Sequence, residues 1–511
     1  MGKLKHDLFE LIKSLDRNEK GYFKKYTHLP SSGSNRSNNY IRLFDAIDAM
    51  EEYDEEKLKD KFKGENFVKQ LFVLKNYLYE NILKSLRLYS AKGTDVTALL
   101  TQITNAEILI QKGHYIRALA IVHSAKKVAF DRESWGYANE LIELERRLYN
   151  ITRDKKMFDH IVSLNTEKKK LTNALENENK YIGLATEFIA MRNKQGSFFT
   201  ASNMIKIKSL MNSELIKKDS KPVSILAKSN QLSLRTLYYE LVKKDKLFYG
   251  AVFESYELYL KNPFAIRKNP FAFVQRAYNI MIALERQGKF KELYDFFEEV
   301  SHYEEKYHVK FNYKLKVLLL EMTMQSKLIY FYQTSQFEKG LDFLQIANKD
   351  IETHRKYISS EALNTFYFVA ARLLIITTKY KEAVLLLNQI LIFQESSFKK
   401  DESVISQYLL LIAHYELGNH DLMQFVKNNF KHQDPIDVMT FLSRQLPLIS
   451  DRKKEKKVFI EFKKILLASK KRDFLQLYFD FLSWAESKIE RITMADVLKK
   501  KQKNKTPHNR L

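Results

Sequence analysis

Side chains that could perform catalysis or bind a metal ion are not spaced for either task. The twelve histidines are scattered, and no two stand three or four residues apart, the spacing that places zinc ligands on one face of a helix. Cysteine is absent, which excludes disulfides, thiolate metal sites and cysteine nucleophiles. The carboxylate pairs Glu298–Glu299 and Glu304–Glu305 are sequence neighbours, which point to different faces of a helix. We therefore predict no catalytic residue, no metal ion and no cofactor.

The thirteen glycines also argue against an enzyme. No two of them lie within ten residues of each other. Dinucleotide-binding turns, phosphate-binding loops, kinase glycine-rich loops and Gly-x-Ser-x-Gly elbows each need two or three glycines in a short stretch. These signatures are excluded, and the sequence predicts a protein without enzymatic activity.

Positive charge is the one chemical property in clear excess. The 511 residues carry a formal net charge of +24, and residues 452–511 hold 18 Lys and Arg against 7 Asp and Glu. Such a region attracts RNA phosphates, acidic lipids or acidic proteins. Most of these residues are lysines, which lack the forked guanidinium that binds phosphate bidentately. The region can therefore be interpreted either as a basic face that only contacts solvent or as an RNA- or ribosome-binding surface. The candidate anion-contacting residues are Lys453, Lys454, Lys456, Lys457, Lys463, Lys464, Lys470, Lys471, Arg472, Lys499, Lys500 and Lys501.

Helical periodicity runs almost from end to end and sets the fold class. Only 13 glycines and 7 prolines occur, too few for the tight turns of a sheet-rich protein of this length. Apolar residues recur at helical spacing in residues 4–15 and 67–86. Asp16, followed three residues later by Glu19, is typical of a capping box that opens a helix, and residues 28–39, rich in Ser and Asn, predict a loop. The chain is expected to be all-α.

Short breaks between helical stretches recur at regular intervals from residue 113 onward. Each break places an aromatic residue or a histidine two residues after a small or polar one, as in Gly113 and Tyr115. Successive breaks lie 40 to 50 residues apart, in the range of stacked helix-pair repeats. A helix hairpin cannot bury its apolar face alone, so it stacks on its neighbours. The eight aromatic or histidine positions are Tyr115, Phe158, Phe198, Phe248, Phe290, Phe337, Tyr380 and His420.

One of these units resembles the tetratricopeptide motif. Its turn carries Gly113 and then Tyr115, and its second helix carries Ala118 and Ala125, seven residues apart. The resemblance extends as a register over residues 95–430. It implies a right-handed superhelix of stacked helix hairpins, in which small residues mark the closest helix crossings.

The other units depart from that motif. The closing proline is Phe130 in the best unit, and the small position is Leu293 or Met423 in others. Together with steps longer than the 34 residues of the motif, these departures imply longer helices and irregular stacking.

The resemblance also predicts a partner-binding face. In tetratricopeptide-like arrays the first helix of each pair lines the concave surface. Tyrosine and arginine there are typical interface anchors, although tyrosines on helices also commonly belong to the core. Aligning the units places six such residues on this surface: Tyr278, Arg286, Tyr332, Arg372, Tyr408 and Tyr415.

These patterns predict three segments and a location. The segments are an N-terminal helical unit (1–93), a tetratricopeptide-like helical repeat array (94–450) and a basic C-terminal helical segment and tail (451–511). The first residues lack the apolar stretch of an export signal, and the most apolar segments are about eleven residues long, against roughly 20 for a membrane helix. We expect a cytoplasmic protein without membrane insertion.

The expected function is that of a scaffold or adaptor. Its concave face would bind an extended or helical segment of another protein. The alternative is an RNA- or ribosome-associated factor that binds through its basic C-terminal region.

Overall fold

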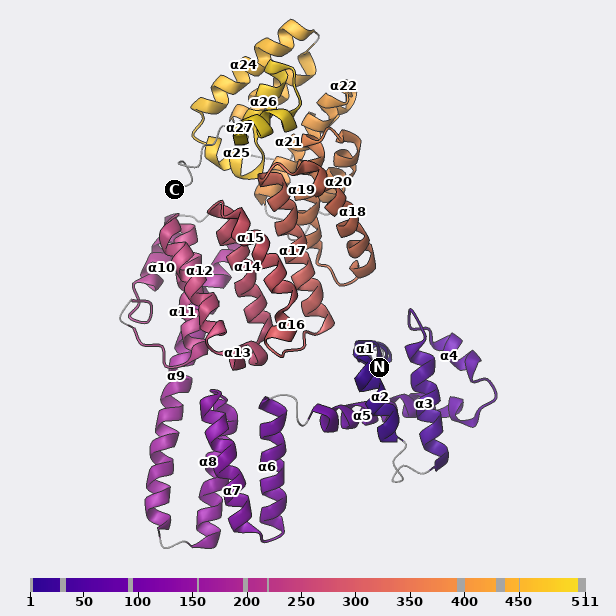
Figure 1. The fold of residues 1–511 in the computed structure, drawn as a ribbon, viewed down its shortest axis with the longest axis vertical. Coiled ribbons are helices and arrows are strands. Elements are labelled where there is room, and N and C mark those ends of the chain that lie inside the picture. Colours follow the sequence, from indigo (N-terminus) through magenta and orange to yellow (C-terminus); the bar gives the residue numbers. More distant parts are fainter. Residues whose placement is uncertain are drawn as a thin grey trace. The chain divides into compact units, whose positions relative to one another are not determined.

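The computed structural model describes residues 3–27, 34–90, 95–153, 156–195, 201–217, 220–392, 400–428, 437–449 and 451–503 (Figure 1). Every regular element in these ranges is a helix, which confirms the predicted all-α class for the described chain. Within the same ranges, no helix has the length and hydrophobicity needed to cross a bilayer. The break predicted at Phe198 lies outside the described residues.

Contacts divide the chain into two compact units. The first comprises Met1–Ile182, Lys221–Lys228 and Asn262–Asn269, and the second comprises Gly183–Ser220, Ser229–Lys261 and Pro270–Leu511. The segment boundaries after residues 93 and 450 stay predictions.

The first unit begins with helices α1 (Lys3–Ser14), α2 (Arg17–Thr27), α3 (Ser34–Asp48), α4 (Glu55–Lys61) and α5 (Leu71–Ser90), with a 3-10 turn at Asn66–Gln70. The predicted capping box is present: the Asp16 amide donates to Glu19 Oε2 at 2.9 Å, and the Glu19 amide donates to Asp16 Oδ1 at 2.8 Å. The loop predicted over residues 28–39 is wrong for residues 34–39, which form the first turns of α3. These residues are polar, but burial of Phe44 and Ile47 later in the same helix stabilises the helical conformation over their weak helix propensity.

Four antiparallel helices complete most of this unit: α6 (Asp95–Gln111), α7 (Tyr115–Asp131), α8 (Trp135–Thr152) and α9 (Met157–Gln195), of which the last contributes residues up to Ile182. The small residues predicted at helix crossings, Ala118 and Ala125, are fully buried in the core between α6, α7 and α8. Side chains of this size let neighbouring backbones approach closely.

The second unit contains successive helix pairs. We call α11 (Ile225–Leu241), α14 (Pro270–Arg286), α17 (Tyr313–Gln333), α19 (Ser360–Ile376) and α21 (Lys400–Glu416) the first helices. The second helices are α12 (Asp245–Leu260), α15 (Phe290–Ser301), α18 (Phe337–His354), α20 (Tyr380–Ile392) and α22 (His420–Asn428). From α14 onward each first helix packs both on its own second helix and on the next first helix. Two shorter helices also belong to this unit: α10 (Ala201–Met211) precedes the first pair, and α16 (Tyr303–Lys306) follows α15. Helix α13 (Pro263–Lys268) belongs to the first unit.

The turns inside the pairs share one geometry. A residue with positive φ follows the first helix, and its amide donates to the carbonyl three residues earlier, as Thr378 does to Ile375 at 3.1 Å. The amide of the next residue donates to the carbonyl five residues earlier, as Lys379 does to Leu374 at 2.8 Å. This is the Schellman motif, which satisfies the last carbonyls of a helix. It recurs at Gly113, Glu133, Lys243, Gly288, Ser335, Thr378 and Gly418.

The predicted breaks coincide with most of these turns. Tyr115, Phe290, Phe337, Tyr380 and His420 are each the first residue of a helix. Phe248 is the fourth residue of α12, because the true turn residue is Lys243, and Phe158 is the second residue of α9. The turn at Glu133, between α7 and α8, was missed since neither glycine nor a repeat interval marks it.

The C-terminal helices continue the core of the last hairpins. They are α23 (Asp437–Gln445), α24 (Arg452–Ala468), α25 (Arg472–Tyr478), α26 (Phe481–Glu490) and α27 (Met494–Lys503). Most of their buried apolar residues, among them Phe459 and Trp484, belong to one hydrophobic cluster with residues of α17 to α22. The ring of Phe368 on α19 lies 6.2 Å from that of Tyr478 on α25.

Replacing Thr378 by glycine is expected to stabilise the second unit. Its φ of +61° places a β-branched residue in the left-handed region, which costs an L-residue roughly 1–2 kcal/mol and glycine almost nothing. Urea unfolding followed by circular dichroism should show an apparent gain of about 0.5–1 kcal/mol. The control is Thr377→Gly, at φ −91° with a hydroxyl that donates to the Leu373 carbonyl at 2.9 Å. A gain from Thr377→Gly equal to that from Thr378→Gly would contradict this explanation.

Candidate functional site

Buried polar side chains in the helix pairs of the second unit lie almost entirely on the first helices. Among the described residues, the second helices bury only Ser255. Those buried on the first helices are Ser229, Gln231, Thr236, Glu321, Gln325, Ser326, Asn364, Arg372, Glu402, Ser403, Ser406, Gln407 and His414. Burial of a polar group is unfavourable unless it is hydrogen-bonded, so this asymmetry marks the first helices as the chemically distinctive side of the pairs.

Some buried nitrogen or oxygen atoms on these helices make no hydrogen bond with the described chain. Among them are Nε of Arg276 on α14, Oδ1 of Asn364 on α19 and Nε of Arg372 on α19. Most buried polar atoms in native proteins do have a partner, and exceptions usually meet water, an ion or a ligand. The first helices therefore offer unused hydrogen-bonding capacity.

Arg372 is the most unusual of these residues. Only 7% of it is exposed, and its guanidinium lies 4.5 Å from the ring centroid of Tyr332 on α17 and 5.8 Å from that of Phe368. Stacking on a tyrosine face compensates part of the cost of burying the charge. The structure thus brings the side chains of Arg372 and Tyr332 into contact and buries the arginine beneath the surface.

A second group of predicted residues surrounds the C-terminal end of α14. The Tyr278 hydroxyl faces Gln325 Oε1 at 3.5 Å, and Arg286 pairs with Glu240 at 2.8 Å and lies 5.1 Å from the Phe248 ring. Burial raises the pKa of Tyr278 to about 12. Burial also raises the pKa of Glu285 to about 7, although the nearby charges of Arg372 and Arg286 act in the opposite direction.

The two remaining predicted tyrosines, Tyr408 and Tyr415, lie on α21. Tyr408 is buried, and its pKa is raised by that burial. The Tyr415 hydroxyl donates to Glu455 of α24 at 2.6 Å, and its ring lies 6.3 Å from that of Trp484. Trp484 Nε1 in turn donates to Glu416 Oε1 at 2.7 Å. The chain's own C-terminal helices therefore occupy this part of the face.

A sequence signal for that coverage exists on α19. Residues 366–376 form an apolar run that only Arg372 interrupts, and all but Tyr367 are buried. A helix that is apolar on every side is packed on every side, so this run predicts that something covers both faces of α19. The repeat alignment instead predicts that one side of α19 faces solvent, and it does not account for this apolar run.

The predicted basic residues separate into two groups. Lys463 and Lys501 both pair with Glu486, at 2.7 Å and 2.6 Å, Lys500 pairs with Glu490 at 3.4 Å, and Lys499 lies over the Phe337 ring. Burial alone would raise the pKa of Glu486, but the hydrogen bonds from its two lysines outweigh it and leave this pKa below its ordinary value. The other eight are exposed: Lys453, Lys454, Lys456, Lys457, Lys464, Lys470, Lys471 and Arg472.

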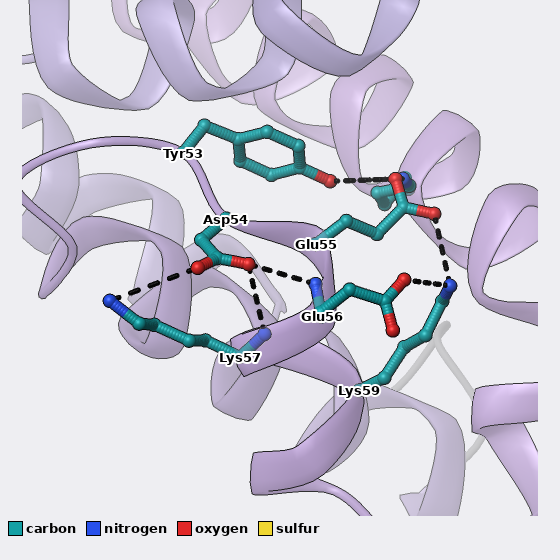
Figure 2. Close-up of polar contacts among 7 residues, drawn as sticks. Tyr53, Asp54, Glu55, Glu56, Lys57 and Lys59 are labelled. Atoms are coloured by element: carbon teal, nitrogen blue, oxygen red, sulfur yellow. Dashed lines mark hydrogen bonds and ion pairs between the residues drawn. The ribbon is translucent and has the colours of Figure 1, made fainter.

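An acidic cluster in the first unit is occupied by structural contacts. Figure 2 shows Asp54 capping α4, where it accepts hydrogen bonds from the amides of Glu56 and Lys57 at 3.0 and 3.1 Å. Glu55 accepts hydrogen bonds from the Tyr53 hydroxyl at 3.3 Å and from the buried Lys75 at 3.1 Å. No group of acidic and histidine side chains in the described part of the chain could hold a metal ion.

Comparison with known proteins adds no relative. No protein-family model matches the chain, and neither a curated protein nor a solved structure does.

Replacing Glu285 by glutamine should stabilise the protein in a pH-dependent way. A carboxyl whose folded-state pKa is about 7, above its ordinary 4.5, favours the native state when protonated, so this contribution is complete below pH 4.5 and lost as the pH rises through 7. Glutamine mimics the protonated form at every pH. The gain over wild type in urea unfolding should be near zero at pH 4.5 and about 1–3 kcal/mol at pH 8.

The control for this measurement is Glu292→Gln on α15, which removes an exposed carboxyl from the neighbouring helix. A gain for Glu285→Gln that is the same at both pH values, or a loss at pH 8, would show that burial does not disfavour the charged form of Glu285.

Proposed function

We propose that this chain is a non-enzymatic helical-repeat scaffold of the tetratricopeptide-like kind. Its hairpins would stack into a right-handed superhelix, and the first helices would form the concave face that binds a segment of another protein. The recurrent Schellman turns and the packing of each first helix on the next support this arrangement.

One observation carries the binding role: polar groups are concentrated, and partly unpaired, on the first helices. A helix pair that served only to build a core would bury apolar residues on both members, as the second helices do. An extended peptide presents backbone donors and acceptors all along its length, and these would pair with polar side chains that stay accessible on the first helices, such as Tyr278 and Arg286 of α14.

The accessible part of this face is expected at α14 and α17. Tyr278 and Tyr332 are half-buried and Arg286 is exposed, whereas Arg372 and Tyr408 are buried and Tyr415 contacts the C-terminal helices. Aromatic rings and an arginine at a partly desolvated surface are the side chains that most often dominate binding energy. We therefore assign recognition to Tyr278, Arg286 and Tyr332, with Arg372 supporting the ring of Tyr332 from below.

Affinity capture from cell extract, with and without ribonuclease, tests this proposal. A protein partner should be retained after ribonuclease treatment and should bind the double variant Tyr278→Phe/Arg286→Ala at least tenfold more weakly, because loss of an anchor typically costs more than about 1 kcal/mol. These substitutions leave the Arg372–Tyr332 stack intact.

The matched control is Tyr294→Phe/Arg355→Ala. It makes the same chemical changes on the second helix α15 and at the end of the second helix α18, where both side chains are exposed. Equal capture by both double variants would overturn the assignment of the first-helix face. Capture that ribonuclease abolishes would instead favour an RNA-associated factor.

A further inference from the structure

Helix α24 has one face fixed in the core and one directed to solvent. Val458, Phe459, Phe462 and Leu466 are buried, and the rings of Phe459 and Trp484 lie 5.0 Å apart. Asp451 caps the helix by accepting hydrogen bonds from the amides of Lys453 and Lys454 at 2.8 and 2.9 Å. The orientation of the opposite, solvent-facing side is therefore set before any partner binds.

The solvent-facing side combines lysines with aliphatic residues in one row. At 100° per residue, six exposed residues fall within an arc of about 100°, and we call them the α24 stripe. Ile460 and Leu467 within it are 48% and 45% exposed. The α24 stripe consists of Lys453, Lys456, Lys457, Ile460, Lys464 and Leu467.

The charges of the α24 stripe have no counter-ion on the described chain. Neighbouring lysines do pair, as Lys463 does with Glu486 and Lys488 with Glu416, but no ion pair joins Lys453, Lys456, Lys457 or Lys464 to another described residue. Glu486 and Glu416 thus pair with lysines that lie outside the α24 stripe.

The position of these lysines is unfavourable within the isolated chain. Five of the first six positions of α24 are basic, namely Arg452, Lys453, Lys454, Lys456 and Lys457, and only Glu455 is acidic. At this end of the helix, the positive end of the helix dipole favours anions over cations. Mutual repulsion adds to this cost. An external anionic surface would relieve both effects.

We propose that the α24 stripe docks the protein on an anionic phospholipid surface, with the axis of α24 parallel to the membrane. Lysines interleaved with aliphatic side chains match a bilayer interface, where the ammonium groups contact lipid phosphates and Ile460 and Leu467 enter the headgroup layer. A nucleic acid would gain nothing from the two aliphatic residues, and the stripe has no aromatic ring on which bases could stack. This proposal is independent of the protein-binding face on α14 and α17.

Vesicle binding of the full chain tests the proposal. At roughly 0.1 M salt, we expect sedimentation with phosphatidylcholine vesicles that contain about one third phosphatidylserine, and none with pure phosphatidylcholine. Lys453→Gln/Lys457→Gln/Lys464→Gln should lower the partition coefficient about 100-fold, since each lysine near an anionic surface contributes about fivefold. Ile460→Ser/Leu467→Ser should lower it about tenfold and leave binding to heparin and single-stranded RNA unchanged.

Two control variants carry the same substitutions on other exposed helix surfaces. Lys291→Gln/Lys339→Gln/Lys381→Gln matches the loss of charge, and Ile346→Ser/Leu385→Ser, at positions 57% and 65% exposed, matches the loss of apolar surface. Both should bind anionic vesicles as wild type does, and far-ultraviolet circular dichroism checks that all four variants remain folded.

Three results would each overturn the proposal. The first is failure of the wild-type chain to bind the anionic vesicles. The second is equal vesicle binding by wild type and Ile460→Ser/Leu467→Ser. The third is displacement of the protein from vesicles by an equal phosphate concentration of single-stranded RNA, which would make nucleic acid the preferred occupant of the α24 stripe.

Discussion

The helices from α14 to α21 depend on contacts between each helix pair and the next. Each first helix from α14 onward packs on its own second helix and on the following first helix, and small residues permit the closest of these approaches. At Gly340, a Cβ atom would lie 3.0 Å from Leu373 Cδ2 and 3.2 Å from Phe331 Cβ, which is tighter than ordinary packing allows. One hydrophobic core therefore runs without interruption from α17 to α27. Polar residues buried in this core must form their hydrogen bonds with other residues of the same helices.

The fold class and most turns could be predicted because their causes are local. The capping box at Asp16 and Glu19 and the turns before Tyr115, Phe290 and Phe337 depend on residues at most five positions apart. Where the left-handed residue is not glycine, the sequence predicts the turn only if an aromatic residue follows it at 40 to 50 residues from the neighbouring breaks. Glu133 had no such interval, and Lys243 lies five residues before Phe248, whereas the pattern places the turn residue two residues before the aromatic one.

The environment of the candidate site was less predictable because it depends on contacts between distant segments. Glu416 meets Trp484 and Lys488, and Glu455 meets Tyr415, so residues about 40 to 70 positions apart decide which tyrosines remain accessible. Helical periodicity identifies the side of a helix that is buried, but it does not say which segment covers it. The same is true of charge: composition revealed the basic C-terminal region, whereas only the structure separates paired lysines such as Lys463 from the exposed α24 stripe.

The shared core of α17 to α27 has a consequence for biosynthesis. Because the ribosome releases the chain from its N-terminal side, α19 and α21 emerge well before α26 delivers Trp484, which is 2% exposed in the finished fold. During that interval, the apolar flank of the last hairpins faces solvent. A truncated translation product that ends before α24 would retain this exposed flank permanently, so premature termination ahead of Arg452 would yield a species prone to aggregation and to recognition by chaperones.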